Sequence, residues 1–239
     1  RWAGYSRFGS GLLGLFFMIQ YVKSKKKMHL FFFGLVSGLA LLYGIDSGII
    51  LLACGALLFI IMSLYGPGTN FRENVIVILK KSFVFLLGLG VALVPFIIYM
   101  AVNKAFIPYL EGMYLMARYH VSAWQTAFPP FMGSLRQYKS FWLFFISDEF
   151  KVYLPRIFYV FVIIYAIAIC KIKKNIIDCA VVPLIVVFGL FAYRSGCRVV
   201  LGPQFDISLL PMLLLFVYFL EKGTAFMLFE RKSAKPAIF

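Results

Sequence analysis

Long apolar segments recur along most of this chain, separated by short connections of which several are basic. A helix that crosses a lipid bilayer needs about 20 mostly apolar residues. Seven segments come close to that length and composition, at residues 5–22, 28–43, 47–65, 82–102, 152–170, 176–193 and 199–220. The pattern therefore predicts an all-α fold, a polytopic transmembrane helix bundle of about seven spans with one long external loop. We expect residues 1–239 to form a single transmembrane domain.

The composition favours a bilayer rather than water as the solvent. The chain is 63% hydrophobic and 14% charged, whereas an ordinary soluble domain is about half apolar and about a quarter charged. The net charge of +15 comes from lysines and arginines at the ends of apolar segments, where they act as topology signals and attract anionic lipid headgroups. Zinc-ligand spacing, a Gly-rich phosphate loop and RNA-binding motifs do not occur. We therefore expect membrane lipids as partners, and no nucleic acid.

Basic connections set the orientation of the predicted spans. With seven spans, four basic segments fall on the same side of the membrane, and they are residues 23–27, 72–81, 171–174 and 230–235. The positive-inside rule makes that side cytoplasmic, which predicts a multi-pass protein of the cell membrane with its C-terminus in the cytoplasm. The outer side then holds the tight turn at residues 43–48, the long segment 103–151 and the stretch 193–206.

The segment 103–151 is predicted to be an external, aromatic-rich loop. It is too polar to span a bilayer and too rich in aromatic residues to be a floppy linker. Tyr, Trp and Phe beside Arg and Lys suit the headgroup layer, and residues 109–120 have the composition of a helix that lies on the membrane surface. Pro129 and Pro130 would end any such helix.

Two glycines, Gly34 and Gly38, lie four residues apart in the second apolar segment. Small residues at this spacing let two helix backbones approach each other closely in a membrane. We interpret the pair as a packing face inside the helix bundle rather than as part of a functional site.

Arginines on the outer side need an explanation, because the positive-inside rule predicts few of them there. Arg194 and Arg198 are four residues apart, so they share a face if the sixth helix extends that far. Two guanidinium groups on one face can hold phosphate oxygens through bidentate hydrogen bonds. Snorkelling to lipid headgroups and a salt bridge to Asp206 are the alternatives. We predict that the two arginines bind the phosphate of a lipid-linked substrate, with Asp46 or Asp206 as an orienting carboxylate.

Further residues are predicted to line the same outer site. Asp46 lies in the tight turn between two apolar segments, where it either caps the helix that follows or presents a carboxylate to a shared external cavity. Arg118 and His120 lie on the long external segment, although a lone histidine is more often an ordinary surface residue than a catalyst. The predicted substrate-binding residues are therefore Asp46, Arg118, His120, Arg194, Arg198 and Asp206.

Three stretches carry a resemblance to a known class of enzyme. Residues 34–58 hold two predicted spans joined by a tight external turn, and residues 91–131 hold a span that runs into an aromatic loop with prolines. Residues 194–216 form a polar external stretch that leads into a proline-containing span. This layout resembles the GT-C-fold glycosyltransferases that use polyprenyl-phosphate sugars, which include the protein O-mannosyltransferases and the lipid A aminoarabinose transferases.

The resemblance implies transfer of a sugar from a lipid phosphate to an acceptor on the outer face of a bacterial inner membrane. In the family, an aspartate or glutamate of the first external loop is the usual base or metal ligand. That loop has no match here, so the principal catalytic carboxylate is expected upstream of Arg1, in a longer chain of which this is a fragment. A divalent metal stays open as a cofactor, with no metal-ligand set in this sequence. A polysaccharide polymerase or flippase, or another multi-pass transporter, is the alternative.

Overall fold

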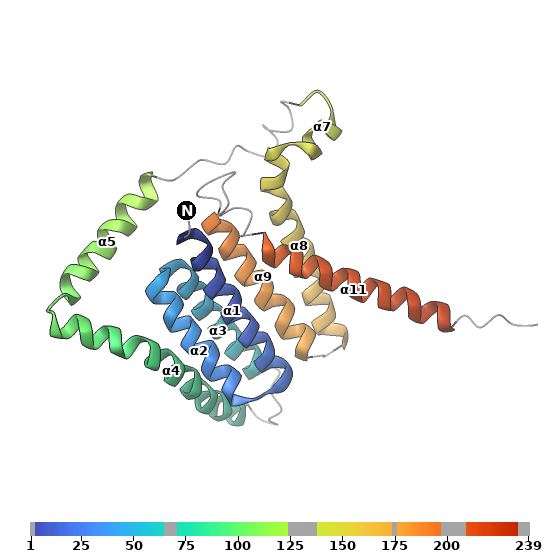
Figure 1. The fold of residues 1–239 in the computed structure, drawn as a ribbon. Helices are drawn as coiled ribbons and strands as arrows, with labels where there is room; N and C mark the ends of the chain where they lie inside the picture. The colour runs from blue at the N-terminus through green and yellow to red at the C-terminus, as the bar shows by residue number, and fades with distance from the viewer. Residues whose placement is uncertain (1–2, 65–70, 124–137, 174–175, 197–208, 234–239) are drawn as a thin grey trace, which may run out of the picture.

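The protein is described by a computed structural model over residues 3–64, 71–123, 138–173, 176–196 and 209–233. These residues form helices joined by turns, with no β-strand among them (Figure 1). The helices are α1 (Ala3–Ser24), α2 (Lys27–Tyr43), α3 (Ile45–Leu64), α4 (Phe71–Val102), α5 (Phe106–Ala123), α7 (Phe141–Ile146), α8 (Asp148–Lys173), α9 (Ile176–Gly196) and α11 (Leu210–Ser233). The predicted all-α fold is confirmed for the described part of the chain.

Each predicted span overlaps one of these helices, but two boundaries differ from the prediction. Residues 72–81, which we expected to form a connection, belong to α4, because no glycine or proline interrupts the sequence before Gly88. The last predicted span starts at residue 199, whereas α11 begins at Leu210, and residues 199–208 lie outside the described residues.

Much of the segment 103–151 is helical rather than an open loop. The helix predicted for residues 109–120 is present within α5. α7 is a single short helix, and the side chain of Ser140 caps it by accepting a hydrogen bond from the backbone N–H of Trp142 at 3.3 Å. Pro129 and Pro130 lie outside the described residues.

A backbone motif ends α4 and starts α5. Lys104 has a φ of 53°, in the left-handed region, and its N–H donates a hydrogen bond to the carbonyl of Ala101 at 3.2 Å. The N–H of Ala105 donates to the carbonyl of Met100 at 2.9 Å. These two hydrogen bonds form a Schellman motif, which satisfies the last carbonyls of a helix and turns the chain out of it. α5 therefore leaves α4 at a sharp angle (Figure 1).

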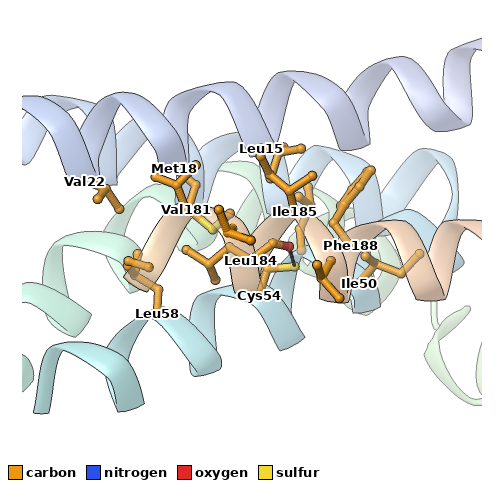
Figure 2. Close-up of a cluster of buried hydrophobic side chains, with 14 of the residues drawn as sticks. Leu15, Met18, Val22, Ile50, Cys54, Leu58, Val181, Leu184, Ile185 and Phe188 are labelled. Carbon is orange, nitrogen blue, oxygen red and sulfur yellow. Dashed lines mark hydrogen bonds between the residues drawn. The ribbon is translucent and has the colours of Figure 1, made fainter. Parts of the chain in front are cut away.

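The core lies where α1, α3 and α9 meet. Each helix presents apolar side chains at intervals of three or four residues, which keeps them on one face. Figure 2 shows this core through Leu15, Met18 and Val22 of α1, Ile50, Cys54 and Leu58 of α3, and Val181, Leu184, Ile185 and Phe188 of α9. Cys54 is fully buried, and its Sγ lies 3.8 Å from the carbonyl oxygen of Leu184. This cysteine is therefore a packing residue.

α2 and α4 touch through their backbones. A Cβ atom added to Gly34 would overlap the carbonyl of Phe85 in α4, and a Cβ atom added to Gly88 would overlap a carbonyl of α2. One turn further along α2, a Cβ atom on Gly38 would lie 2.6 Å from the Cβ of Ala92. The predicted packing face at Gly34 and Gly38 is thus confirmed, and its partner is α4.

The contacts also give the relative directions of the helices. Residue numbers rise together along the contact between α2 and α4, so these two helices are parallel. Figure 2 shows that α1 and α3 run in the same direction while α9 runs in the opposite one. α1 and α2 are antiparallel, because a turn of two residues joins them (Figure 1). The connections between these helices therefore alternate between two ends of the bundle.

The two ends of the bundle differ in charge. One end, here called the basic end, holds Lys23 and the lysines at residues 25–27, together with Lys80 and Lys81 of α4, which lie level with the start of α2. The opposite end holds Asp46 at the start of α3 and Arg194 in the last turn of α9. The described helices therefore bring two basic segments that are distant in sequence to the same end.

Among the residues that the structure describes, two helices are long and apolar enough to cross a membrane, judged by length and composition: Ile45–Ser63 of α3 and Val75–Val102 of α4. α4 is much less buried than α3. Its exposed large apolar side chains are Ile76, Val77, Leu79, Phe83, Leu86, Leu87, Val91, Val94, Ile97, Ile98, Tyr99 and Val102. This surface agrees with association with a membrane, while the number of spans stays a prediction.

We predict that Gly88→Ala destabilises the fold, whereas Gly90→Ala in the same helix does not. The methyl group at position 88 overlaps the backbone of α2, and overpacking of this kind costs about 1–3 kcal/mol. A Cβ atom on Gly90 meets nothing within 4 Å, so that variant gains up to about 1 kcal/mol from the helix propensity of alanine. Thermal unfolding of both variants in detergent measures the difference, and equal unfolding temperatures would contradict the close contact.

Candidate functional site

At the end of the bundle opposite the lysines, a side-chain contact holds α8 and α9 together. Tyr193 of α9 is buried, and its hydroxyl group donates a hydrogen bond to the backbone carbonyl of Val152 in α8. Deeper in the bundle, the hydroxyl group of Tyr159 lies so close to Gly189 that a Cβ atom there would overlap it. These two contacts make the helices antiparallel and fix the position from which Arg194 extends. We call this region the α8–α9 junction.

A second arginine lies at the α8–α9 junction. The Cζ atom of Arg156 is 5.9 Å from the centre of the Tyr153 ring and 5.8 Å from the centre of the Tyr193 ring. A guanidinium group within about 6 Å of an aromatic ring is attracted by the negative face of that ring. The Arg156 side chain remains exposed, so the two rings orient its charge without removing it from the surface.

The sequence analysis missed Arg156 as a site residue. One signal was visible, because Tyr153 and Arg156 are three residues apart and so neighbour each other on a helix. The contact with Tyr193 was not visible, since it depends on how α8 packs against α9. The guanidinium group of Arg156 is thus held by two tyrosine rings from two helices, an arrangement that the sequence alone did not indicate.

Arg194 is exposed in the last turn of α9. A cation at this position is stabilised by the negative end of the helix dipole. α9 ends at Gly196, and Arg198 and Asp206 lie outside the described residues. The shared helix face of Arg194 and Arg198 therefore stays a prediction, as does the salt bridge to Asp206.

Asp46 lies at the same end of the bundle as Arg194, in the first turn of α3. α3 begins at Ile45, so Asp46 is inside the helix rather than at the N-cap position before it. A carboxylate in a first turn still faces the positive end of the helix dipole. The Asp46 side chain is half-buried and the neighbouring Ser47 is buried. This environment positions one carboxylate at the end of the bundle that carries the arginines.

The structure does not bring all the predicted residues together. Arg118 is exposed on α5, and His120 lies in the same helix with its side chain outside the described part of the chain. α5 packs against α4, where the rings of Phe96 and Tyr109 are 5.4 Å apart. Figure 1 shows α5 separated from α9, so Arg118 is not part of the α8–α9 junction.

Aromatic side chains lie beside the α8–α9 junction. In α7, which directly precedes α8, Phe141 is 59% exposed and Trp142 is 76% exposed. Phe144 is buried beneath them and makes an edge-to-face contact with Phe150 at 5.6 Å. Exposed aromatic rings beside cations are typical of the interface between a membrane and water. The junction is therefore surrounded by side chains suited to lipid headgroups.

Comparisons with known proteins add no assignment. No family model matches the chain, and no curated protein or solved structure matches it. Within the residues that the structure describes, no group of three or more His, Cys, Asp and Glu side chains could hold a metal ion. The candidate site therefore rests on geometry, with Arg156 and Arg194 at the junction and Asp46 at the same end of the bundle.

We expect Tyr193→Phe to destabilise the protein by about 1 kcal/mol, the typical net contribution of one hydrogen bond. The ring stays in place in this variant, so its contact with Arg156 is kept. Tyr99→Phe is the control, because the Tyr99 side chain is 63% exposed on α4. Thermal unfolding in detergent compares the two. If both variants unfold at the same temperature as the wild type, the hydrogen bond to Val152 does not hold the junction together.

Proposed function

We propose that this protein is a multi-pass membrane glycosyltransferase, which transfers a sugar from a polyprenyl-phosphate donor to an acceptor on the outer face of the membrane. The observation that carries the proposal is the position of Arg156 and Arg194 at the end of the bundle opposite the lysines. The positive-inside rule accounts for cations at one end only. The arginines therefore need another role, and phosphate is the ligand that best suits a guanidinium group.

The helix directions support the membrane orientation in this proposal. The lysines of the α1–α2 turn and of the start of α4 share one end, which the positive-inside rule assigns to the cytoplasm. The apolar helices α3 and α4 are long enough to cross a membrane. On this basis the α8–α9 junction, with the exposed aromatic rings of α7 beside it, lies at the outer headgroup level.

The chemistry that we propose for the junction is stabilisation of a leaving phosphate. In the transfer, the bond between the sugar and the donor phosphate breaks, and the electron pair stays on the phosphate oxygen as the acceptor oxygen bonds to the sugar. Guanidinium groups placed at the developing negative charge lower the barrier for this step. We propose that Arg156 and Arg194 supply this charge, that Arg198 adds to it, and that Asp46 or Asp206 orients the donor.

The alternative functions gain less support. A transporter is expected to carry a helix break or ionisable groups near the middle of a span. The best such break in the sequence is Pro95, but α4 continues through Pro95 to Val102 without interruption. No contact in the described residues favours a polymerase or flippase over the transferase. The glycosyltransferase therefore remains the function that we propose.

The proposed orientation predicts which ends of the helices are accessible from outside the cell. In a variant without its native cysteines, an impermeant thiol reagent applied to intact cells should label Lys104→Cys and not Lys26→Cys. Both positions are exposed; Lys26 lies at the basic end, and Lys104 follows the opposite end of α4. After permeabilisation both should react, which controls for accessibility. Labelling of Lys26→Cys in intact cells would contradict the orientation.

The proposed phosphate site predicts that the arginines contribute to donor binding. Each hydrogen bond between arginine and phosphate typically contributes about 1.5–3 kcal/mol, so Arg194→Ala and Arg156→Ala should each weaken binding of a polyprenyl-phosphate sugar by about tenfold or more. Lysine should restore little, because it keeps the charge but loses the bidentate geometry. Binding is measured with the protein in nanodiscs, and sugar transfer to water or a model acceptor is followed with the same labelled donor.

Lys104→Ala is the matched control for these variants. Lys104 is an exposed cation of the α4–α5 turn, which lies away from α9 (Figure 1), so its loss should leave donor affinity unchanged. Unchanged affinity in both arginine-to-alanine variants, with thermal unfolding intact, would disprove the phosphate site. If affinity falls but no sugar transfer occurs with any acceptor, the protein binds the lipid phosphate without being a transferase.

A further inference from the structure

Lysines from two separate parts of the chain meet at the basic end of the bundle. They are Lys23 at the end of α1, Lys25 and Lys26 of the α1–α2 turn, Lys27 at the start of α2, and Lys80 and Lys81 of α4. Lys27 and Lys81 lie about two helical turns before Gly34 and Gly88, the glycines through which their helices touch. Because α2 and α4 are parallel, Lys81 is level with the start of α2. The close glycine contact thus brings the two groups of lysines together.

These lysines repel each other rather than pair with acids. Lys81 is close enough to Lys25 for the two positive charges to interact unfavourably. Among the residues that the structure describes, no carboxylate forms an ion pair with any of the six lysines. The surrounding protein partly desolvates the Lys25 ammonium group, which lowers its pKa below the ordinary value. An anion bound between Lys25 and Lys81 would relieve both the repulsion and the loss of hydration.

The start of α2 adds to the positive potential. Lys26 occupies the N-cap position without making a side-chain hydrogen bond to the helix, and the first turn contains no acidic residue. The N–H groups of Lys26 and His29 donate to Ser24 Oγ and to the carbonyl of Lys26, and the start of α2 still contributes the positive end of its helix dipole. Lys25 itself has a φ of 57°, a conformation that disfavours residues other than glycine. Position 25 thus carries a lysine although its backbone conformation favours glycine.

We propose that Lys25 and Lys81 bind the phosphate group of an anionic phospholipid between the α1–α2 turn and α4. A lipid is favoured over a free phosphate because exposed apolar side chains of α4 lie on both sides of these lysines. Leu79 is 64% exposed and Phe83 is 62% exposed, so acyl chains can lie along α4 while the headgroup meets the lysines. The inference rests on the membrane location in the proposed function, but it does not depend on sugar transfer or on Arg194.

Native mass spectrometry of the intact protein in detergent tests the site, with phosphatidylglycerol and phosphatidylcholine as probes. The wild type should retain phosphatidylglycerol in preference to phosphatidylcholine. Lys25→Gln and Lys81→Gln should each weaken that retention by about fivefold, which corresponds to about 1 kcal/mol for one lysine at an anionic lipid surface. Lys104→Gln is the matched control, because Lys104 is also an exposed lysine in the left-handed region, with a φ of 53°, at the other end of α4.

The results of this experiment distinguish a phospholipid site at Lys25 and Lys81 from the absence of a site and from a site for soluble phosphate. Retention that is unchanged in Lys25→Gln and Lys81→Gln, or reduced equally in Lys104→Gln, would overturn the site. Inorganic phosphate added in excess should not displace the lipid. Displacement by phosphate, with the same dependence on Lys25 and Lys81, would overturn the lipid as ligand and assign the site to a soluble phosphate compound. Binding of polyprenyl-phosphate sugar should be unchanged in both glutamine variants, so failure here is distinguishable from failure of the proposed transferase.

Discussion

The arrangement of charge in this protein depends on one contact, the meeting of α2 and α4 through Gly34 and Gly88. Without side chains at these positions, the two backbones approach until each glycine lies against a carbonyl of the other helix. Close packing of this kind holds helices together in a membrane, where the hydrophobic effect gives no preference for helix over lipid. Because the contact is parallel, it also brings the lysines of the α1–α2 turn and of α4 to one end of the bundle.

A second set of contacts organises the other end. The core of α1, α3 and α9 fixes the direction of α9, and the hydrogen bond from Tyr193 to Val152 fixes α8 beside it. Arg156 then lies between two tyrosine rings, next to the end of the helix that carries Arg194. The two ends thus differ: lysines from two separate segments gather at the end where topology signals are expected, and Arg156 and Arg194 lie at the other. This difference is the basis of the proposed function.

Several parts of the fold could be predicted from the sequence because they are local. Apolar segments of sufficient length predicted the helices, and the spacing of Gly34 and Gly38 predicted a packing face. The helical start of α4 at Phe71 was missed, since basic and polar residues between spans were interpreted as a connection. In the candidate site, Arg194 and Asp46 were identified by their charge in an apolar context, whereas Arg156 was missed because its second ring, Tyr193, comes from another helix.

The sequence by itself determined that the described part of the chain is helical and that the chain is apolar, with many of its basic residues near the ends of the apolar segments. Composition and spacing are sufficient for this, because each helix satisfies its own backbone hydrogen bonds. Only the tertiary structure decided which helices touch: that Gly34 faces α4, that Tyr193 holds α8, and that Lys25 lies near Lys81. The physical reason is that packing depends on the shapes of two surfaces at once, which no single stretch of sequence contains.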